Sequence, residues 1–202
     1  MSATEEIAAA AARLVVEHGL EYGAAKRKAA RDLGRRSGRA GELPSNEEIE
    51  DEVRSHLELF CADTQPAELR ALREVALSWM QRLAEFRPHL TGAAWRGTAT
   101  RLSAVHLDLY CDDSKAAEIA LLNLGVPYDV DSIDRPGQPP VEVLTVSSPS
   151  RALGEPVTVH LSILDRDEQR GALRPDARGR SWRGDAAALQ RLLAQDDEGA
   201  LP

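Results

Sequence analysis

Hydrophobic residues recur every three or four positions from the start of the chain to about residue 88. Ile7, Ala11, Leu14 and Val15 show this pattern in the first segment. A spacing near 3.6 residues places apolar side chains on one face of a helix. The pattern therefore predicts amphipathic helices at residues 4–18, 22–33, 47–60 and 66–86.

Local signals for helix ends accompany these segments. Ser2 with Glu5 has the spacing of a capping box, in which each residue caps the backbone of the other. Either Ser45 or Asn46 can cap the third helix. Gly19 is a natural C-terminal stop for the first helix, because glycine accepts the left-handed conformation found there.

After residue 88 the pattern changes to alternation of apolar and polar residues, which is typical of strands with one buried face. We expect strands at residues 90–96, 104–111, 127–132, 140–147 and 156–164, and helices at 114–124 and 185–195.

This order predicts an α+β fold, in which N-terminal helices are followed by a mixed, mostly antiparallel sheet with flanking helices. We expect a helical segment at residues 1–64, an α+β domain at 65–195 and a disordered tail at 196–202.

Composition narrows the class of protein. The net charge of −8 argues against a nucleic-acid coat, which needs a basic surface. The two cysteines, Cys61 and Cys111, lie far apart and without metal-ligand spacing, which fits a reducing compartment. No signal peptide or membrane-spanning apolar run is evident in the sequence. We expect a cytoplasmic protein with no membrane partner.

Most of the candidate site residues lie in the stretch 94–113, which we interpret as a strand, a Gly97-Thr98 turn and a second strand. His106 and Asp108 are two residues apart and so share one face of the second strand. Asp108 with Asp129 or Asp131 on the following strand could hold magnesium, which prefers oxygen ligands. Close to the turn, Arg96 or Arg101 could reach a phosphate.

At these residues the chain resembles the nucleotidyltransferase fold of the DNA polymerase beta superfamily. In that family a strand ending in Gly-Gly or Gly-Ser is followed, on the next strand, by Asp-x-Asp or Asp-x-Glu. Here Gly97-Thr98 matches the first motif and His106-Leu107-Asp108 the second. The resemblance implies a nucleotidyltransferase-like fold, a nucleotide or phosphorylated ligand, Mg²⁺ as cofactor, and His106 and Asp108 at catalytic positions.

The chain departs from this family pattern at two places. Only Ala99–Val105 separates the two motifs, and histidine replaces the first carboxylate. Neutral imidazole is a poor magnesium ligand. Both an active magnesium-dependent nucleotidyltransferase and a degenerate copy that only binds its ligand therefore remain open.

Over nearly its whole length the chain also resembles a bacterial family of about this size, through LEYGAAKRKAARDLG, FCADTQPAELRALRE and GALRPDARGR. Some of its members carry an automatic label as UDP-N-acetylmuramate–alanine ligase. We do not adopt that label, because the chain has no G-x-x-x-x-G-K-[ST] phosphate loop.

Two basic segments allow more than one interpretation. Residues 26–39 could bind a partner protein or nucleic acid, or could form salt bridges with the acidic third helix. The segment 165–184 includes Trp182 and Arg183, which could stack on a base or bind phosphate, or could belong to an ordinary surface loop. The alternative function is thus a non-enzymatic regulatory or interaction protein that binds a partner through its N-terminal helices.

Overall fold

The computed structural model describes residues 2–34, 43–135, 137–170, 179 and 181–199. The chain forms two compact units. The first unit comprises Met1–Glu68 with Thr98–Ser103, and the second comprises Leu69–Gly97 with Ala104–Pro202.

The first unit is built from three helices, α1 (Ala3–His18), α2 (Tyr22–Asp32) and α3 (Asn46–Phe60). Their buried faces form one apolar core, which includes Ile7, Ala11, Val15, Tyr22, Ala25, Ile49, Val53 and Leu57. The capping boxes form at Ser2 with Glu5 and at Ser45 with Glu48. Gly19 ends α1 in the left-handed conformation, with φ of 65°.

The segment Thr98–Ser103 completes the first unit. The Thr98 hydroxyl lies 3.3 Å from the Tyr22 hydroxyl. Gly19 packs so closely on Leu102 that a Cβ at Gly19 would lie 2.6 Å from the Leu102 carbonyl oxygen. The α1–α2 turn therefore needs glycine both for its backbone conformation and for this approach.

The second unit is an α+β fold, as the sequence predicts. Its helices are α4 (Gln65–Arg82, which begins in the first unit), η1 (Ala84–Phe86), α5 (Gly92–Arg96), α6 (Ser114–Asn123), η2 (Arg166–Gln169) and α7 (Ala186–Gly199). Its strands are β1 (His89–Thr91), β2 (Val105–Cys111), β3 (Asp129–Arg135), β4 (Gln138–Ser150) and β5 (Glu155–Asp165).

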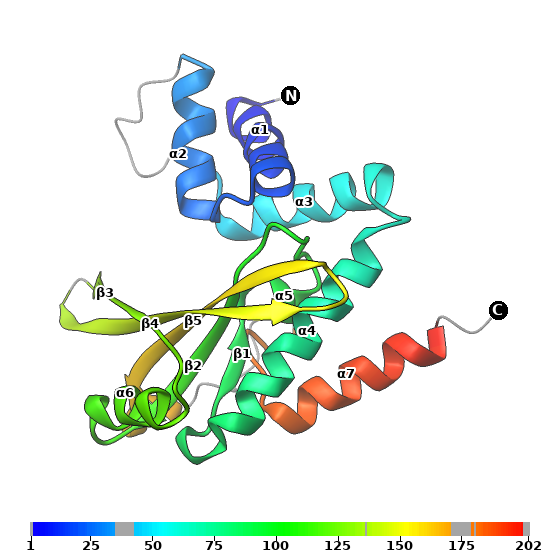
Figure 1. The fold of residues 1–202 in the computed structure, drawn as a ribbon. Helices are drawn as coiled ribbons and strands as arrows, with labels where there is room; N and C mark the ends of the chain where they lie inside the picture. Colours follow the sequence, from blue (N-terminus) through cyan, green and yellow to red (C-terminus); the bar gives the residue numbers. More distant parts are fainter. Residues whose placement is uncertain (1, 35–42, 136, 171–178, 180, 200–202) are drawn as a thin grey trace. The chain divides into compact units, whose positions relative to one another are not determined.

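The five strands form one mixed sheet in the order β1-β2-β5-β4-β3 (Figure 1). Between these strands, β2 pairs with β5 in parallel, whereas β1 with β2, β3 with β4 and β4 with β5 pair antiparallel. The expected mixed, mostly antiparallel sheet with flanking helices is confirmed. Arg73 of α4 donates a hydrogen bond to Asp196 of α7, and these two helices lie side by side in Figure 1.

The alternation on β2 separates an apolar face from a polar one. Val105, Leu107 and Leu109 are fully buried, whereas His106 and Asp108 are half-buried on the opposite face. The apolar face continues across the sheet, since Leu107 pairs with Leu161 and Leu161 with Leu144. The polar face is consequently the one that carries the candidate chemistry.

Several element boundaries differ from the sequence prediction, most clearly around residues 89–97 and at the last helix. The expected strand at 90–96 is only His89–Thr91, and the chain then turns into the short helix α5. Gly97, with φ of 83°, ends α5 instead of forming a hairpin turn between strands. The last helix runs on to Gly199 rather than ending at residue 195.

Within the described ranges, no helix combines the length and the apolar character needed to cross a bilayer.

Candidate functional site

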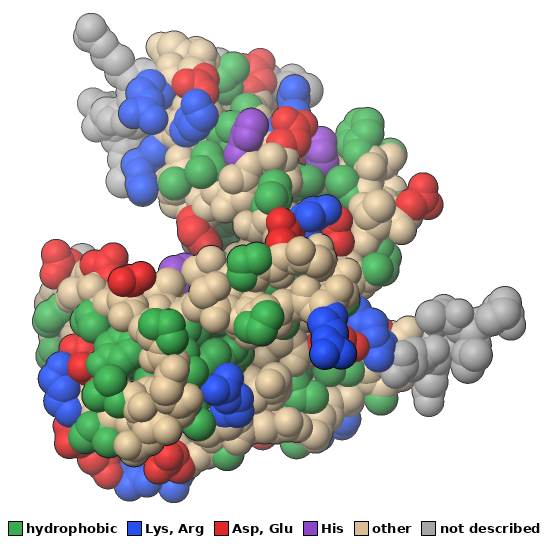
Figure 2. Space-filling model, in the orientation of Figure 1, with side chains coloured by type: hydrophobic (Ala, Val, Ile, Leu, Met, Phe, Trp, Pro, Cys, Tyr) green, Lys and Arg blue, Asp and Glu red, His purple; other side chains and the backbone are tan. Residues whose placement is uncertain are grey.

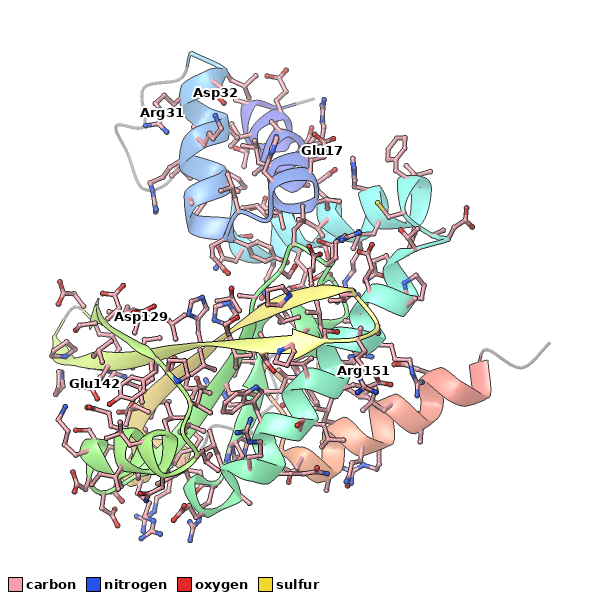
Figure 3. All side chains as sticks on the ribbon, viewed as in Figure 1. Glu17, Arg31, Asp32, Asp129, Glu142 and Arg151 are labelled. Carbon is pink, nitrogen blue, oxygen red and sulfur yellow. The ribbon has the colours of Figure 1, made fainter. Side chains whose placement is uncertain are left out.

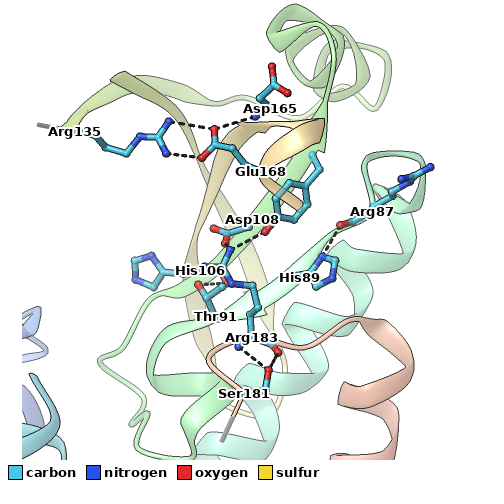
Figure 4. Close-up of polar contacts among 11 residues, drawn as sticks. Arg87, His89, Thr91, His106, Asp108, Arg135, Asp165, Glu168, Ser181 and Arg183 are labelled. Carbon is cyan, nitrogen blue, oxygen red and sulfur yellow. Dashed lines mark hydrogen bonds and ion pairs between the residues drawn. The ribbon is translucent and has the colours of Figure 1, made fainter. Parts of the chain in front are cut away.

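A part-buried arginine–carboxylate contact lies on the polar face, on β2 next to the β1 edge. The Nη1 atom of Arg183 donates to Asp108 Oδ2 at 2.6 Å and to the Tyr110 hydroxyl at 2.7 Å. The Asp108 side chain is 14% exposed, so water screens this ion pair only weakly. Figure 4 shows the Arg183 and Asp108 side chains pointing toward one another.

Residues 181–184, which we call the 181–184 segment, bring Arg183 to this position. Gly184 exchanges two backbone hydrogen bonds with Leu90 of β1, at 2.8 and 3.0 Å. Trp95 Nε1 donates to the Ser181 carbonyl oxygen at 2.8 Å. A Cβ at Gly184 would lie 2.0 Å from the Trp95 ring, so only glycine fits under this indole. The segment is thereby fixed against the β1 edge.

Burial and charge oppose each other at Asp108. Burial raises the pKa of the Asp108 carboxyl, and the nearby charges of Arg183, His89 and His106 reduce this effect without reversing it. Burial also raises the pKa of the Tyr110 hydroxyl, and the Asp108 charge raises it further. The site therefore favours the neutral forms of both acids more than water does.

His89 of β1 pairs with Asp108 across the two strands, so its side chain lies beside the ion pair on the same face of the sheet. It is 3% exposed, and its Nδ1 lies 2.8 Å from the Arg87 carbonyl oxygen. Its ring meets the Tyr110 ring edge-on, with centroids 5.3 Å apart. This packing holds Tyr110 in place beside Arg183.

Next to the ion pair, a row of polar side chains crosses the sheet. His106 pairs with His160, which in turn pairs with Thr145. The two imidazole rings are 5.0 Å apart, and His160 Nδ1 lies 2.9 Å from the Thr145 hydroxyl. Both histidines are half-buried. Their nitrogens can donate or accept hydrogen bonds according to the tautomer.

The carboxylates expected to share a metal with Asp108 lie elsewhere on this face. Asp131 pairs with Val143, Val143 with Ser162 and Ser162 with Asp108, so three strand spacings, or about 14 Å, separate the two aspartates. Asp129 occupies the same edge strand and is exposed. The structure thus does not bring Asp129 or Asp131 to Asp108.

The residues present do not fit the expected magnesium site. Asp108 is held by a guanidinium, and a cation beside the carboxylate opposes the approach of a second one. Among the residues that the structure describes, no three side chains of His, Cys, Asp or Glu come together as metal ligands.

The expected phosphate-binding residues are distributed over both units. Gly97 ends α5, and Arg96 lies over the Trp182 ring at 5.4 Å; these three belong to the second unit. Thr98 and Arg101 belong to the first unit. Thr98 is 1% exposed, and the exposed Arg101 has its backbone N–H bonded to Glu68.

Parts of both basic segments lie outside the described residues, namely 35–42, 171–178 and 180. In the described part of the first segment, Lys26 donates to Asn46 at 3.0 Å and Lys28 pairs with Asp32. The acidic Glu50 of α3 pairs with Arg54 of the same helix.

The sequence analysis assigns no site role to Tyr110 or His89. Tyr110 continues the polar face of β2 two residues after Asp108, so the strand period was a signal for it. His89 gave no comparable signal, because its position follows from the pairing of β1 with β2.

No protein-family model and no curated protein sequence matches the chain. Two solved structures of the Cid1 poly(U) polymerase are similar to part of it. The structure with MgGTP bound matches at 14% identity and a TM-score of 0.36, over 56% of this chain and 38% of that one. The complex with the UTP analogue UMPNPP matches at 13% identity and a TM-score of 0.34, over 56% and 36%. Both are nucleotidyltransferase-fold proteins.

Proposed function

We propose that this protein binds a nucleotide or another phosphorylated small molecule on the polar face of its sheet, and that it does so without magnesium-dependent catalysis. The ligand would lie over His106, Asp108 and His160. The observation that carries the proposal is the ion pair between Arg183 and Asp108 beside the two adjacent imidazole rings.

The chemistry of these side chains suits a phosphorylated ligand. Imidazole, guanidinium and hydroxyl groups all donate hydrogen bonds to phosphate oxygens. One row across the sheet supplies imidazole groups from His106 and His160 and a hydroxyl group from Thr145. The guanidinium group comes from Arg183, which contacts Asp108 in the neighbouring row. An ionised Asp108 accepts hydrogen bonds only, which suits the hydroxyls of a sugar.

The same contacts argue against metal-dependent transfer. Two-metal phosphoryl transfer requires at least two carboxylates close enough to share the ions. Asp108 has Arg183 as its neighbour, and Asp131 lies about 14 Å away by strand spacing. The proposed protein is therefore a binding protein whose ligand could act as a signal or a cargo.

A thermal-shift titration tests this proposal. ATP, GTP, CTP and UTP are added to the full chain in EDTA and, separately, in excess Mg²⁺. A ligand that binds only the folded state stabilises it by about 2.7 kcal/mol at 100 times its Kd. We expect at least one nucleotide to raise the Tm in EDTA, and the His106→Ala/His160→Ala double variant to lose this shift.

His18→Ala is the matched control, because His18 is an exposed histidine of the first unit. It should retain the full shift. The proposal fails if no nucleotide raises the Tm of the wild type, or if the double variant responds as the wild type does. A shift that occurs only with Mg²⁺ would instead favour the active enzyme.

A further inference from the structure

Among the residues that the structure describes, the sheet has one open edge, formed by β3. The opposite edge, β1, has only three residues and is paired on its outer side with Gly184. By contrast, β3 has seven residues and is last in the strand order, and in the described ranges its pairing partner is β4 alone. Its outward N–H and C=O groups can therefore pair with another extended chain.

The two faces of this edge differ in character. Asp129 and Asp131 pair with Thr145 and Val143 and so point to the polar face of the sheet. Val130 pairs with Leu144 and points to the other face, where it is 55% exposed. Asp129 and Glu142 lie on opposite sides of the β3–β4 ribbon in Figure 3, consistent with this register.

Exposed apolar side chains extend from Val130 onto α6. Lys115 of α6 forms an ion pair with Glu142, which shares the face of Leu144, so α6 lies on the same side of the sheet as Val130. Ile119 and Leu122 of α6 are 53% and 64% exposed. Figure 2 shows hydrophobic side chains gathered where α6 and β3 lie. A contiguous apolar surface beside an open strand is typical of an interaction site.

The negative charge of β3 favours a positively charged partner segment at this edge. In the described part of the chain, Asp129, Asp131 and Asp134 of β3 have no cationic partner. The one basic residue of the strand, Arg135, is already bound to Glu168, at 2.6 and 3.2 Å. Two copies of β3 would bring six aspartates together, so charge repulsion disfavours pairing with a second copy of this chain.

We propose that the β3 edge receives an extended segment of a partner protein with the pattern Lys/Arg–apolar–Lys/Arg. The added strand would place its two cations opposite Asp129 and Asp131. Its central apolar residue would pack beside Val130, on the side of Ile119 and Leu122. Backbone hydrogen bonds would supply affinity, and the alternating side chains would supply specificity.

Fluorescence anisotropy with a labelled synthetic peptide tests this inference. The probe carries Lys-Val-Lys-Val-Lys between short Gly-Ser ends, and the full-length chain is titrated into it. We expect saturable binding that weakens with salt. Asp129→Lys/Asp131→Lys should weaken binding at least about tenfold, and this variant should bind a Glu-Val-Glu-Val-Glu probe better than the wild type does.

Two controls separate strand addition from attraction to an acidic protein. Glu17→Lys/Glu58→Lys makes the same change of net charge at exposed positions of the first unit and should bind as the wild type does. A probe with alternate backbone amides methylated keeps its charges but cannot pair as a strand. Equal binding of the methylated probe, or equal weakening by the control variant, overturns the proposal.

Sedimentation of the unliganded protein completes the test. We expect no dimer that depends on the β3 edge. A dimer that Asp129→Lys/Asp131→Lys dissociates would assign the edge to a second copy of this chain and overturn the inference.

Discussion

At the scale of single residues, Asp108 combines a largely buried carboxyl group with a direct contact to a cationic side chain. It was expected to face a metal and another carboxylate. It contacts Arg183 and lies beside Tyr110 on a half-buried face. The same carboxyl group thus serves as the acceptor in an ion pair, and its ionisation is coupled to folding through burial.

The pH dependence of stability tests this environment. Because burial raises the pKa of Asp108, the folded protein keeps this proton to higher pH than the unfolded chain does. The stability of the wild type relative to Asp108→Asn is therefore greatest below about pH 3.9, the ordinary value for aspartate, and falls as pH rises through the folded pKa. Urea unfolding of both proteins from about pH 3.5 to pH 8 measures the difference.

A relative stability of the wild type that rises with pH would mean that the attraction of Arg183 outweighs burial.

At the scale of elements, the 181–184 segment is joined to β1 by the bridge between Gly184 and Leu90, and this bridge positions Arg183. It has no regular hydrophobic pattern, and its place depends on Gly184 lying against Trp95. The segment therefore links the ion pair at Asp108 to the packing of α5, where Trp95 lies.

Gly184→Ala should separate this segment from the sheet. The added methyl group would overlap the Trp95 ring, and overpacking of this kind costs about 1–3 kcal/mol. The loss should appear in urea unfolding, together with faster hydrogen exchange at Leu90. Gly23→Ala, inside helix α2, should be neutral or stabilising by about 0.5–1 kcal/mol. A fully stable Gly184→Ala protein would contradict the close packing.

Helix ends that depend on local sequence signals could be predicted from the sequence. Contacts that depend on the pairing of distant strands could not. Ser2 and Ser45 begin helices and Gly19 ends one, each through bonds to residues a few positions away, so their roles follow from short motifs. The pairing of His106 with His160 joins residues far apart in the chain. The separation of Asp108 from Asp131 depends on β5 and β4 lying between them, an order that no local pattern specifies.

At the scale of the whole molecule, the chain has two hydrophobic cores, one in each unit. The first is an all-helical core, and the second is a sheet with helices. Each core should respond separately to a cavity, because side chains transmit packing defects mainly to their own neighbours.

Ile49→Ala tests this separation. Ile49 is fully buried in the helical core, and such a truncation costs about 2–5 kcal/mol. Hydrogen exchange should accelerate in α1, α3 and the segment 98–103, and remain unchanged in β2 and β5. Leu161→Ala in β5 is the reciprocal variant. Equal acceleration in both units for either variant would show a single cooperative body.

The short segment Thr98–Ser103 has a further consequence for how the chain can be divided. It returns to the helical unit after the polypeptide has already begun the other one. No single cut in the chain, whether made by a protease or by truncating the gene, leaves both units intact. A fragment ending at residue 68 would lack the threonine that meets Tyr22 and the leucine that covers Gly19. The helical part is therefore an inseparable portion of this chain rather than a detachable module.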